Sequence, residues 1–216
     1  MGTYKPGVFG PFNGRVGDVV AAKWKDVNVV KNRPAKSKKP ATVTQIDQRA
    51  RFGLGTTFAG KAAEMIAIGF RGMAGNVTPT NIVAKQLLKD CITGTYPNYV
   101  LDYPKISLSK DGNLDLGSKL SVQVLPEQTV QVSWVMDTKP GKVTDATDKV
   151  YILLYNADKH KSIKSGDGLV RGDSPVNLYV PGSFIGDKVH CWLFFASVKN
   201  KEVSATAYLG VVTILA

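Results

Sequence analysis

Residues 31–70 read KNRPAKSKKPATVTQIDQRARFGLGTTFAGKAAEMIAIGF, and they join a basic arm to a long segment with helical periodicity. In the arm, Pro34 and Pro40 each remove a backbone N–H donor and favour an extended chain. The arm is therefore predicted to be an exposed strap rather than an element of the core. Its cations, with no acid among them, are Lys31, Arg33, Lys36, Lys38 and Lys39.

A helix is predicted to begin where the prolines end. Thr42 is placed to cap it, and Gln45 three residues later completes a capping box. Gly53, Gly55 and Gly60 lie inside the helix, and each costs roughly 1 kcal/mol relative to Ala. We therefore expect the helix to need a closely packed neighbour. Apolar residues recur at spacings of three and four, which predicts a buried face made of Ile46, Ala50, Leu54, Phe58, Ala62, Met65 or Ile66, and Phe70.

Two strands are predicted on the N-terminal side of the strap, over residues 16–24 and 27–30. They are joined at Lys25 and Asp26 into a hairpin, because their apolar residues alternate along each strand. An isolated hairpin is marginal in water. We therefore expect this one to pack on the following helix, on the second half of the chain or on another copy of the chain.

A second helix is predicted after the first. Thr78 followed by Pro79 is typical of a helix N-terminus, with proline at the first helical position. The helix is expected to run to Cys91 and to end at Gly94. Cys91 is predicted to be a buried small apolar residue rather than a nucleophile, because no His lies near it in the sequence.

The pattern changes from Tyr99 onward, where short alternating runs are separated by turn signals. This pattern predicts an antiparallel β-sandwich of immunoglobulin or fibronectin type. Trp134 is expected to pack between the two sheets. Tyr151, Leu153 and Tyr155 are expected to flank it. The predicted strands cover residues 105–109, 119–124, 129–136, 149–155, 168–171, 176–180, 188–197 and 203–214.

The whole chain is thus predicted to have an α+β fold with two domains. Residues 1–98 form a hairpin, strap and two-helix assembly module, and residues 99–216 form the immunoglobulin-like sandwich. With 216 residues, 44% hydrophobic and 21% charged, the chain has the composition of a globular protein and can bury a substantial core.

The net charge of +11 is concentrated in the first half of the chain. Residues 1–104 hold 15 Lys and Arg against 6 acids, whereas residues 105–216 hold 13 against 11. A basic half favours anionic partners, which include nucleic acid, an acidic protein face and a membrane surface. A solvated or subunit-facing basic surface is the plainer interpretation.

Several kinds of site find no support in the sequence. Cys91 and Cys191 are too sparse for a disulfide framework or a metal site. No apolar run reaches the roughly 18 residues of a membrane-spanning helix, and the N-terminus has no signal-peptide pattern. Cytoplasmic synthesis is therefore expected. No Ser, His and acid constellation or carboxylate pair stands out, so we predict no enzyme, cofactor, metal or small-molecule substrate.

Two motifs in the second half suggest functions but have structural explanations. His190 shares a strand face with Trp192 and Phe194 and is expected to be a structural residue rather than a ligand. Residues 171–173 spell the integrin-binding tripeptide Arg-Gly-Asp. A turn that contains a charged pair is the favoured interpretation of that tripeptide.

The chain contains the segments GPFNGRVGDVVAAKWKDVNVVKNRPAKSKKPATVTQIDQRARF, Gly69-Phe70, YPNYVLDYPKISLSKDGNL, VSWVMD, DKVYILLYN and KEVSATAYLG. Together these segments resemble a family of uncharacterised Bacteroidota proteins of about 200 residues. The resemblance covers nearly the whole chain and implies no activity.

A looser likeness links the first of these segments to predicted phage virion proteins. The shared order is a basic strand, Arg-Pro, Pro-Thr-x-x-Gln and a helix with Arg-x-x-Phe, and this chain departs from it by one residue between Pro and Thr. The likeness implies a structural role in a virion. The matching positions are Arg33, Pro34, Pro40, Thr42, Gln45, Arg49 and Phe52.

The leading hypothesis is a structural protein that self-assembles into a homo-oligomer or with other structural subunits, in a virion, a filament or a surface array. One alternative is a nucleic-acid-binding module in which lysines contact phosphates and Trp24 stacks on bases. A second is glycan binding by the sandwich through Trp192, Tyr179 or Tyr208. The candidate contact residues are Lys23, Trp24, Lys25, Lys31, Arg33, Lys36, Lys38, Lys39, Gln45, Arg49 and Phe52.

Overall fold

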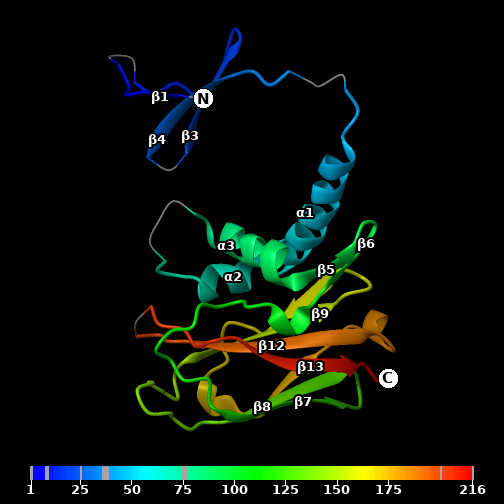
Figure 1. Cartoon of the computed structure of the whole chain (residues 1–216). Helices are drawn as coiled ribbons and strands as arrows, with labels where there is room; N and C mark the ends of the chain where they lie inside the picture. Colours follow the sequence, from blue (N-terminus) through cyan, green and yellow to red (C-terminus); the bar gives the residue numbers. More distant parts are fainter. Residues whose placement is uncertain are drawn as a thin grey trace. The chain divides into compact units, whose positions relative to one another are not determined.

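The computed structural model describes residues 2–7, 10–24, 26–35, 39–73, 77–199 and 201–215. Contacts between Cα atoms divide the chain into two compact units, Met1–Val43 and Thr44–Ala216. Helices and antiparallel sheets are both present, which confirms the α+β class (Figure 1). The two units are described separately.

The first unit is a four-stranded antiparallel sheet with the strand order β1-β4-β3-β2. The predicted hairpin is confirmed, since β3 and β4 pair from Val19 opposite Asn32 to Trp24 opposite Val27. The predicted strand over residues 16–24 is interrupted at Gly17, which has φ +59°, so its first residue belongs to a separate strand. The strand bounds are β1 Gly2–Thr3, β2 Gly14–Val16, β3 Val19–Trp24 and β4 Val27–Asn32.

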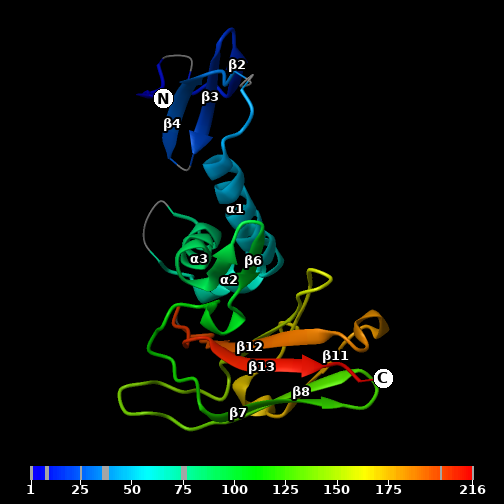
Figure 2. The ribbon, with the colours of Figure 1, turned by 45° about the vertical axis from the view of Figure 1, so that its right-hand side comes forward.

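The second unit has three layers, which the two views in Figures 1 and 2 show. Helices cover one face of a four-stranded sheet with the order β10-β9-β12-β13, and a three-stranded sheet with the order β11-β8-β7 covers the other face. The strands of these sheets are β7 Ser118–Leu125, β8 Thr129–Val135, β9 Lys149–Asn156, β10 Lys161–Lys164, β11 Val176–Tyr179, β12 Lys188–Ala196 and β13 Ala207–Thr213.

Two hydrophobic clusters fill the spaces between these layers. In one, Phe58 and Ile66 of the helices pack with Trp192 of β12. In the other, Trp134 of β8 packs with Leu193 of β12, so Trp134 lies between the sheets as predicted. Consecutive residues of β12 therefore enter different clusters, as the alternation of strand side chains requires.

The prediction of which residues flank Trp134 was wrong. Tyr151, Leu153 and Tyr155 of β9 face the helices, whereas Ile152 and Leu154 share the cluster of Trp134. Residues 150–156 are all buried, because both faces of β9 are covered. Such a continuous apolar run is typical of a strand between two layers, and VYILLY in the sequence carried that signal.

The helices and the sheets fall in the same unit because they share one of these clusters. The unit boundary lies after Val43, whereas the sequence pattern placed a domain boundary at residue 98. The sequence pattern grouped the helices with the N-terminal hairpin because the short alternating runs begin only at Tyr99.

The predicted long helix is divided into α1 Val43–Lys61 and α2 Ala63–Gly69. The helical stripe is confirmed in its second part, where Phe58, Ala62 and Ile66 are fully buried. It is wrong at its start, since Ile46 is 40% exposed. Of the three glycines Gly53, Gly55 and Gly60, only Gly55 has a closely packed neighbour, since an added Cβ would lie 3.5 Å from the Cβ of Leu87 and 3.7 Å from Ile92.

The second predicted helix is confirmed as α3 Pro79–Gln86, continued by the π-helix η1 Leu87–Cys91. Thr78 caps it by accepting a hydrogen bond from the backbone N–H of Asn81 at 3.3 Å. The hairpin that follows was missed, because Gly94 was interpreted as a helix terminator. Gly94 has φ +92° and lies in β5 Ile92–Thr95, which pairs with β6 Asn98–Leu101.

Two of the predicted strands, at residues 105–109 and 168–171, are not strands in the structure. Leu108 and Ser109 instead donate their backbone N–H groups to the hydroxyl of Thr206, at 3.0 and 2.9 Å. A side chain therefore supplies the hydrogen bonds that a neighbouring strand would have supplied. The short helices are η2 Tyr103–Lys105, η3 Arg171–Asp173 and η4 Gly182–Phe184.

Candidate functional site

The candidate contact residues are divided between the N-terminal unit and α1. Of these, Lys25, Lys36 and Lys38 lie outside the described residues. Gln45, Arg49 and Phe52 belong to α1 in the second unit. The candidates described in the first unit are Lys23 and Trp24 in β3, Lys31 in β4, and Arg33 and Lys39 after β4.

One face of the sheet combines an exposed aromatic ring with cations. Residues directly opposite each other in an antiparallel pair project on the same side. Trp24 opposite Val27 and Val20 opposite Lys31 therefore share a face, and Arg15 joins them through its pairing with Val20. Trp24 is 54% exposed and Val27 is 41% exposed.

Lys23 lies on the opposite face, because successive side chains of β3 alternate and Lys23 directly precedes Trp24. The structure therefore brings Trp24 and Lys31 together and separates Lys23 from them. Arg15 was missed because it directly precedes the predicted strand over residues 16–24 and belongs to β2 in the structure. Its place on this face depends on the register that sets Arg15 opposite Val20, which the sequence of one strand does not reveal.

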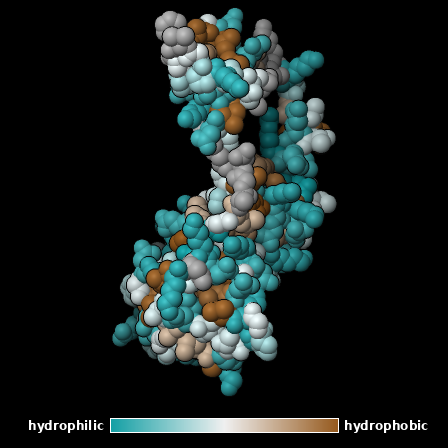
Figure 3. All heavy atoms as spheres, turned by 90° about the vertical axis from the view of Figure 1, so that its left-hand side faces the viewer, coloured by the Kyte–Doolittle hydropathy of each residue, from teal (hydrophilic) through white to brown (hydrophobic). Residues whose placement is uncertain are grey.

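The first unit buries almost nothing. Ala21 is its one buried residue among those that the structure describes, with 2% exposure. Val16 is 65% exposed and Phe12 is 42% exposed. Figure 3 shows apolar side chains at the surface of this unit, which lies at the top of the view. Each face of the sheet therefore carries exposed apolar side chains.

The strap is exposed where it is described. Arg33, Pro34 and Ala35 are exposed and lie outside helices and strands, as predicted. The backbone N–H of Arg33 donates to the carbonyl oxygen of Asp18 at 2.8 Å, which ties the start of the strap to the turn between β2 and β3.

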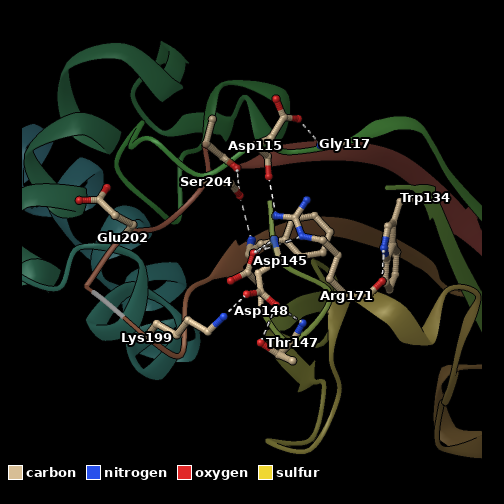
Figure 4. A network of polar contacts seen from close by, with 12 residues as sticks. Asp115, Gly117, Trp134, Asp145, Thr147, Asp148, Arg171, Lys199, Glu202 and Ser204 are labelled. Atoms are coloured by element: carbon tan, nitrogen blue, oxygen red, sulfur yellow. Dashed lines mark hydrogen bonds and ion pairs between the residues drawn. The ribbon is translucent and has the colours of Figure 1, made fainter. Parts of the chain in front are cut away.

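A buried polar network occupies one end of the two sheets in the second unit (Figure 4). The Arg171 guanidinium lies 3.8 Å from the centre of the Phe195 ring and donates to the Asp115 carbonyl at 2.6 Å. Its Nε lies 3.6 Å from Oδ2 of Asp148. Trp134 donates its indole N–H to the Arg171 carbonyl at 2.9 Å. Arg171 is 1% exposed, so the Arg-Gly-Asp tripeptide is not displayed as a recognition loop.

The two acids of this network differ in pKa. Burial raises the pKa of Asp148, and the Asp145 N–H and Arg171 only partly offset it. Burial acts in the same direction on Asp115, but the backbone N–H groups of Gly117 and Lys139 outweigh it and lower the pKa of that carboxyl. The carboxylates of both acids accept hydrogen bonds from the backbone, which fits a structural role for the network.

His190 also belongs to a packed cluster. Its ring stacks on Tyr103 with 3.8 Å between centroids, and its Nδ1 shares a hydrogen bond with the Tyr208 hydroxyl at 2.8 Å. Burial lowers the pKa of His190, with Asp158 acting in the opposite direction. The neighbouring Trp192 is fully buried, which overturns its expected role in glycan binding.

Both cysteines are free and fully buried. Burial, with a smaller contribution from Asp90, raises the pKa of the Cys91 thiol to about 11, and burial raises the pKa of the Cys191 thiol to about 12. Thiols of this kind stay protonated at neutral pH and are poor nucleophiles. Cys91 is therefore a core residue, as predicted.

The described parts of the chain, residues 2–7, 10–24, 26–35, 39–73, 77–199 and 201–215, show neither a metal-binding cluster nor a membrane-spanning helix. His, Cys, Asp and Glu side chains within these ranges nowhere gather in threes that could bind a metal ion. No described helix combines the length and the apolar character that crossing a lipid bilayer requires.

The comparisons with known proteins give one positive result. A family model described as "Family of unknown function (DUF6266)" matches residues 11–210. The search of curated proteins found no match.

Proposed function

The chain belongs to the DUF6266 family of unknown function, and we propose that it is a non-enzymatic structural subunit that self-assembles through its N-terminal unit. The observation that carries this proposal is the sheet of residues 2–32, which leaves Trp24 and Val27 exposed on one face and Val16 exposed on the other. Units of about 40 residues seldom have enough core to be stable without a partner or a cross-link. A neighbouring subunit would supply the apolar contacts that this sheet lacks.

The proposal includes a division of roles. The N-terminal unit anchors or oligomerises, and the second unit, whose paired sheets we propose to be an immunoglobulin-type sandwich, is displayed. A phage virion ranks first among the possible assemblies, ahead of a cellular filament or a surface array. A gene position among capsid, portal and tail genes would support a virion, and a position far from any such gene would count against it.

Light scattering after size-exclusion chromatography tests self-assembly. The wild type should form oligomers at micromolar concentrations, and Trp24→Ser combined with Val27→Ser should shift it toward the monomer. Tyr179→Ser is the matched control, because Tyr179 is an aromatic residue of the second unit that is 68% exposed. A wild type that stays monomeric throughout the concentration range contradicts the proposal.

Nucleic-acid binding is the second candidate, and it is favoured by the shared face of Trp24, Lys31 and Arg15. Residues 1–43 hold nine Lys and Arg against two Asp. A ring that stacks on bases beside cations that contact phosphates is the arrangement by which proteins bind single strands. Fluorescence anisotropy with a labelled oligonucleotide should show affinity that falls steeply with salt and weakens in Trp24→Ala. A flat salt response would remove this candidate.

A further inference from the structure

An apolar groove lies between α1 and the continuous segment formed by α3 and η1, inside the second unit. Its volume is about 480 Å³, within the range of about 300 to 1,000 Å³ that is typical of binding pockets. One wall comes from Phe52 of α1. The rest of the lining comes from Asn81, Ala84, Lys85, Leu88 and Lys89.

The spacing of the lining residues gives the groove a floor and a rim. Ala84 and Leu88 are four residues apart, and Lys85 and Lys89 are also four residues apart, so each pair follows one side of the helical segment. Phe52 is 53% exposed, whereas Phe58, six residues later on a different face of the same helix, is fully buried. The groove therefore presents an aromatic ring and aliphatic side chains to solvent.

The rim is positively charged. Neither Lys85 nor Lys89 forms an ion pair with an acid in the described parts of the chain. A partner that brings carboxylates to this rim would gain electrostatic complementarity, and the same arrangement would exclude a basic partner.

We propose that this groove binds an acidic amphipathic helix of another protein. An apolar side chain of that helix would lie against Phe52 and Leu88, and its carboxylates would face Lys85 and Lys89. Grooves between helices commonly bind partners in this way, through apolar side chains spaced three and four residues apart. The single exposed ring lies in the wall of a concave surface, which suits an inserted side chain better than a lipid bilayer.

A second copy of the chain does not supply such a helix. Each helix that the structure describes carries at most one acid, and these acids are Asp47 in α1, Glu64 in α2, Asp90 in η1 and Asp173 in η3. Asp47 accepts a hydrogen bond from the Tyr99 hydroxyl, and Glu64 pairs with Lys164. Charge complementarity therefore selects a different protein as the partner.

Fluorescence polarisation with a synthetic probe tests this proposal. The probe is a fluorescein-labelled helical peptide with leucines at positions i, i+3, i+4 and i+7 and glutamates elsewhere. The full chain should bind it saturably, and Lys85→Glu combined with Lys89→Glu should weaken binding by about tenfold or more. Phe52→Ala should weaken it by about tenfold without any change in charge, which separates insertion of a side chain from general attraction to a basic protein.

Matched controls define the outcomes. Lys161→Glu combined with Lys188→Glu makes the same change in charge at two exposed lysines outside the groove and should leave binding unchanged. The same peptide with lysines in place of glutamates should not bind. Equal binding by the wild type and Phe52→Ala, no binding by the wild type, or binding to anionic phosphatidylserine vesicles in place of the peptide would each overturn the proposal. If Phe52→Ala removed the oligomers but left peptide binding intact, self-assembly would depend on Phe52. That result would contradict the proposal that the N-terminal unit assembles on its own.

Discussion

At the scale of single residues, Gly69 shows most directly how closely the layers approach. A Cβ added at this glycine would lie 2.1 Å from the carbonyl oxygen of Leu108 and 2.7 Å from the Cα of Ser109. The Gly69 carbonyl also accepts a hydrogen bond from the Lys110 N–H at 3.1 Å. The end of α2 therefore touches the backbone of the following segment, and a side chain has no room there.

Gly69→Ala should lower the free energy of unfolding by about 2 kcal/mol or more, because backbone atoms cannot move aside cheaply. Gly60→Ala in α1 is the control, since nothing lies within 4 Å of its added Cβ. This control should raise the free energy of unfolding by about 1 kcal/mol through helix propensity. Urea unfolding of both variants gives the measurement, and equal effects of the two would refute the close approach.

Asp115 should make the fold sensitive to acid. Burial alone would raise its pKa, but hydrogen bonds from the Gly117 N–H at 2.6 Å and the Lys139 N–H at 2.9 Å lower it. Because the folded pKa lies below the unfolded one, the stabilisation is present at neutral pH and is lost as pH falls through the folded pKa. The free energy of unfolding should therefore decrease less between about pH 7 and about pH 3 in Asp115→Asn than in the wild type.

The control for this acid sensitivity is Asp111→Asn. The Asp111 side chain is 76% exposed and pairs with Lys142 at the surface, so the variant should keep the acid dependence of the wild type. Urea unfolding at each pH supplies the comparison. The same acid dependence in all three proteins would show that Asp115 contributes nothing to it.

At the scale of elements, α1 is attached to the central sheet mainly by Phe58. Its ring centre lies 5.0 Å from that of Tyr155 and 5.6 Å from that of Trp192, and the side chain is fully buried. The other end of α1 makes fewer buried contacts, since Val43 is 81% exposed. The helix is therefore held at its C-terminal half.

Phe58→Ala should cost about 3 to 5 kcal/mol of the free energy of unfolding, because it leaves a cavity among aromatic rings. Phe52→Ala on the same helix should change it by less than about 0.5 kcal/mol, since that ring is 53% exposed. Thermal melting followed by near-ultraviolet circular dichroism reports both the stability and the packing of Trp192. Similar losses in the two variants would mean that α1 is not held where the structure places it.

The helices and strands also differ in whether they could be predicted from the sequence. Short strand-like runs between turn signals located β7, β8, β9, β11 and β12, and the Thr78-Pro79 pair located the start of α3, because these signals are local. The hairpin β5-β6 was not predicted, because a glycine such as Gly94 can lie within a strand as well as at the end of a helix. The shared face of Trp24, Lys31 and Arg15 depends on strand register, which one strand does not reveal on its own.

At the scale of the whole molecule, the unit boundary after Val43 predicts which truncations fold. Deleting residues 2–40 leaves the second unit whole, so cooperative melting and the β circular dichroism should persist while higher oligomers disappear. Persistence of the oligomers would place self-assembly in the second unit instead.

Deleting residues 2–98 should have a different result, because it removes Phe58 and Ile66 from the cluster that covers Trp192 and Phe194. The uncovered sheet face should bind the dye ANS and aggregate, and cooperative melting should be lost. If this deletion instead gave a stable, soluble protein, the predicted domain boundary at residue 98 would be correct.

The cluster shared by helices and sheet also has a consequence for synthesis on the ribosome. Phe58 is translated 134 residues before Trp192, the residue that covers it in the finished fold. At about 5 to 20 residues per second, that interval lasts roughly 7 to 27 s. During this time the nascent helices lack the sheet that covers Phe58, so we expect the growing chain to bind chaperones that hold apolar segments until translation ends.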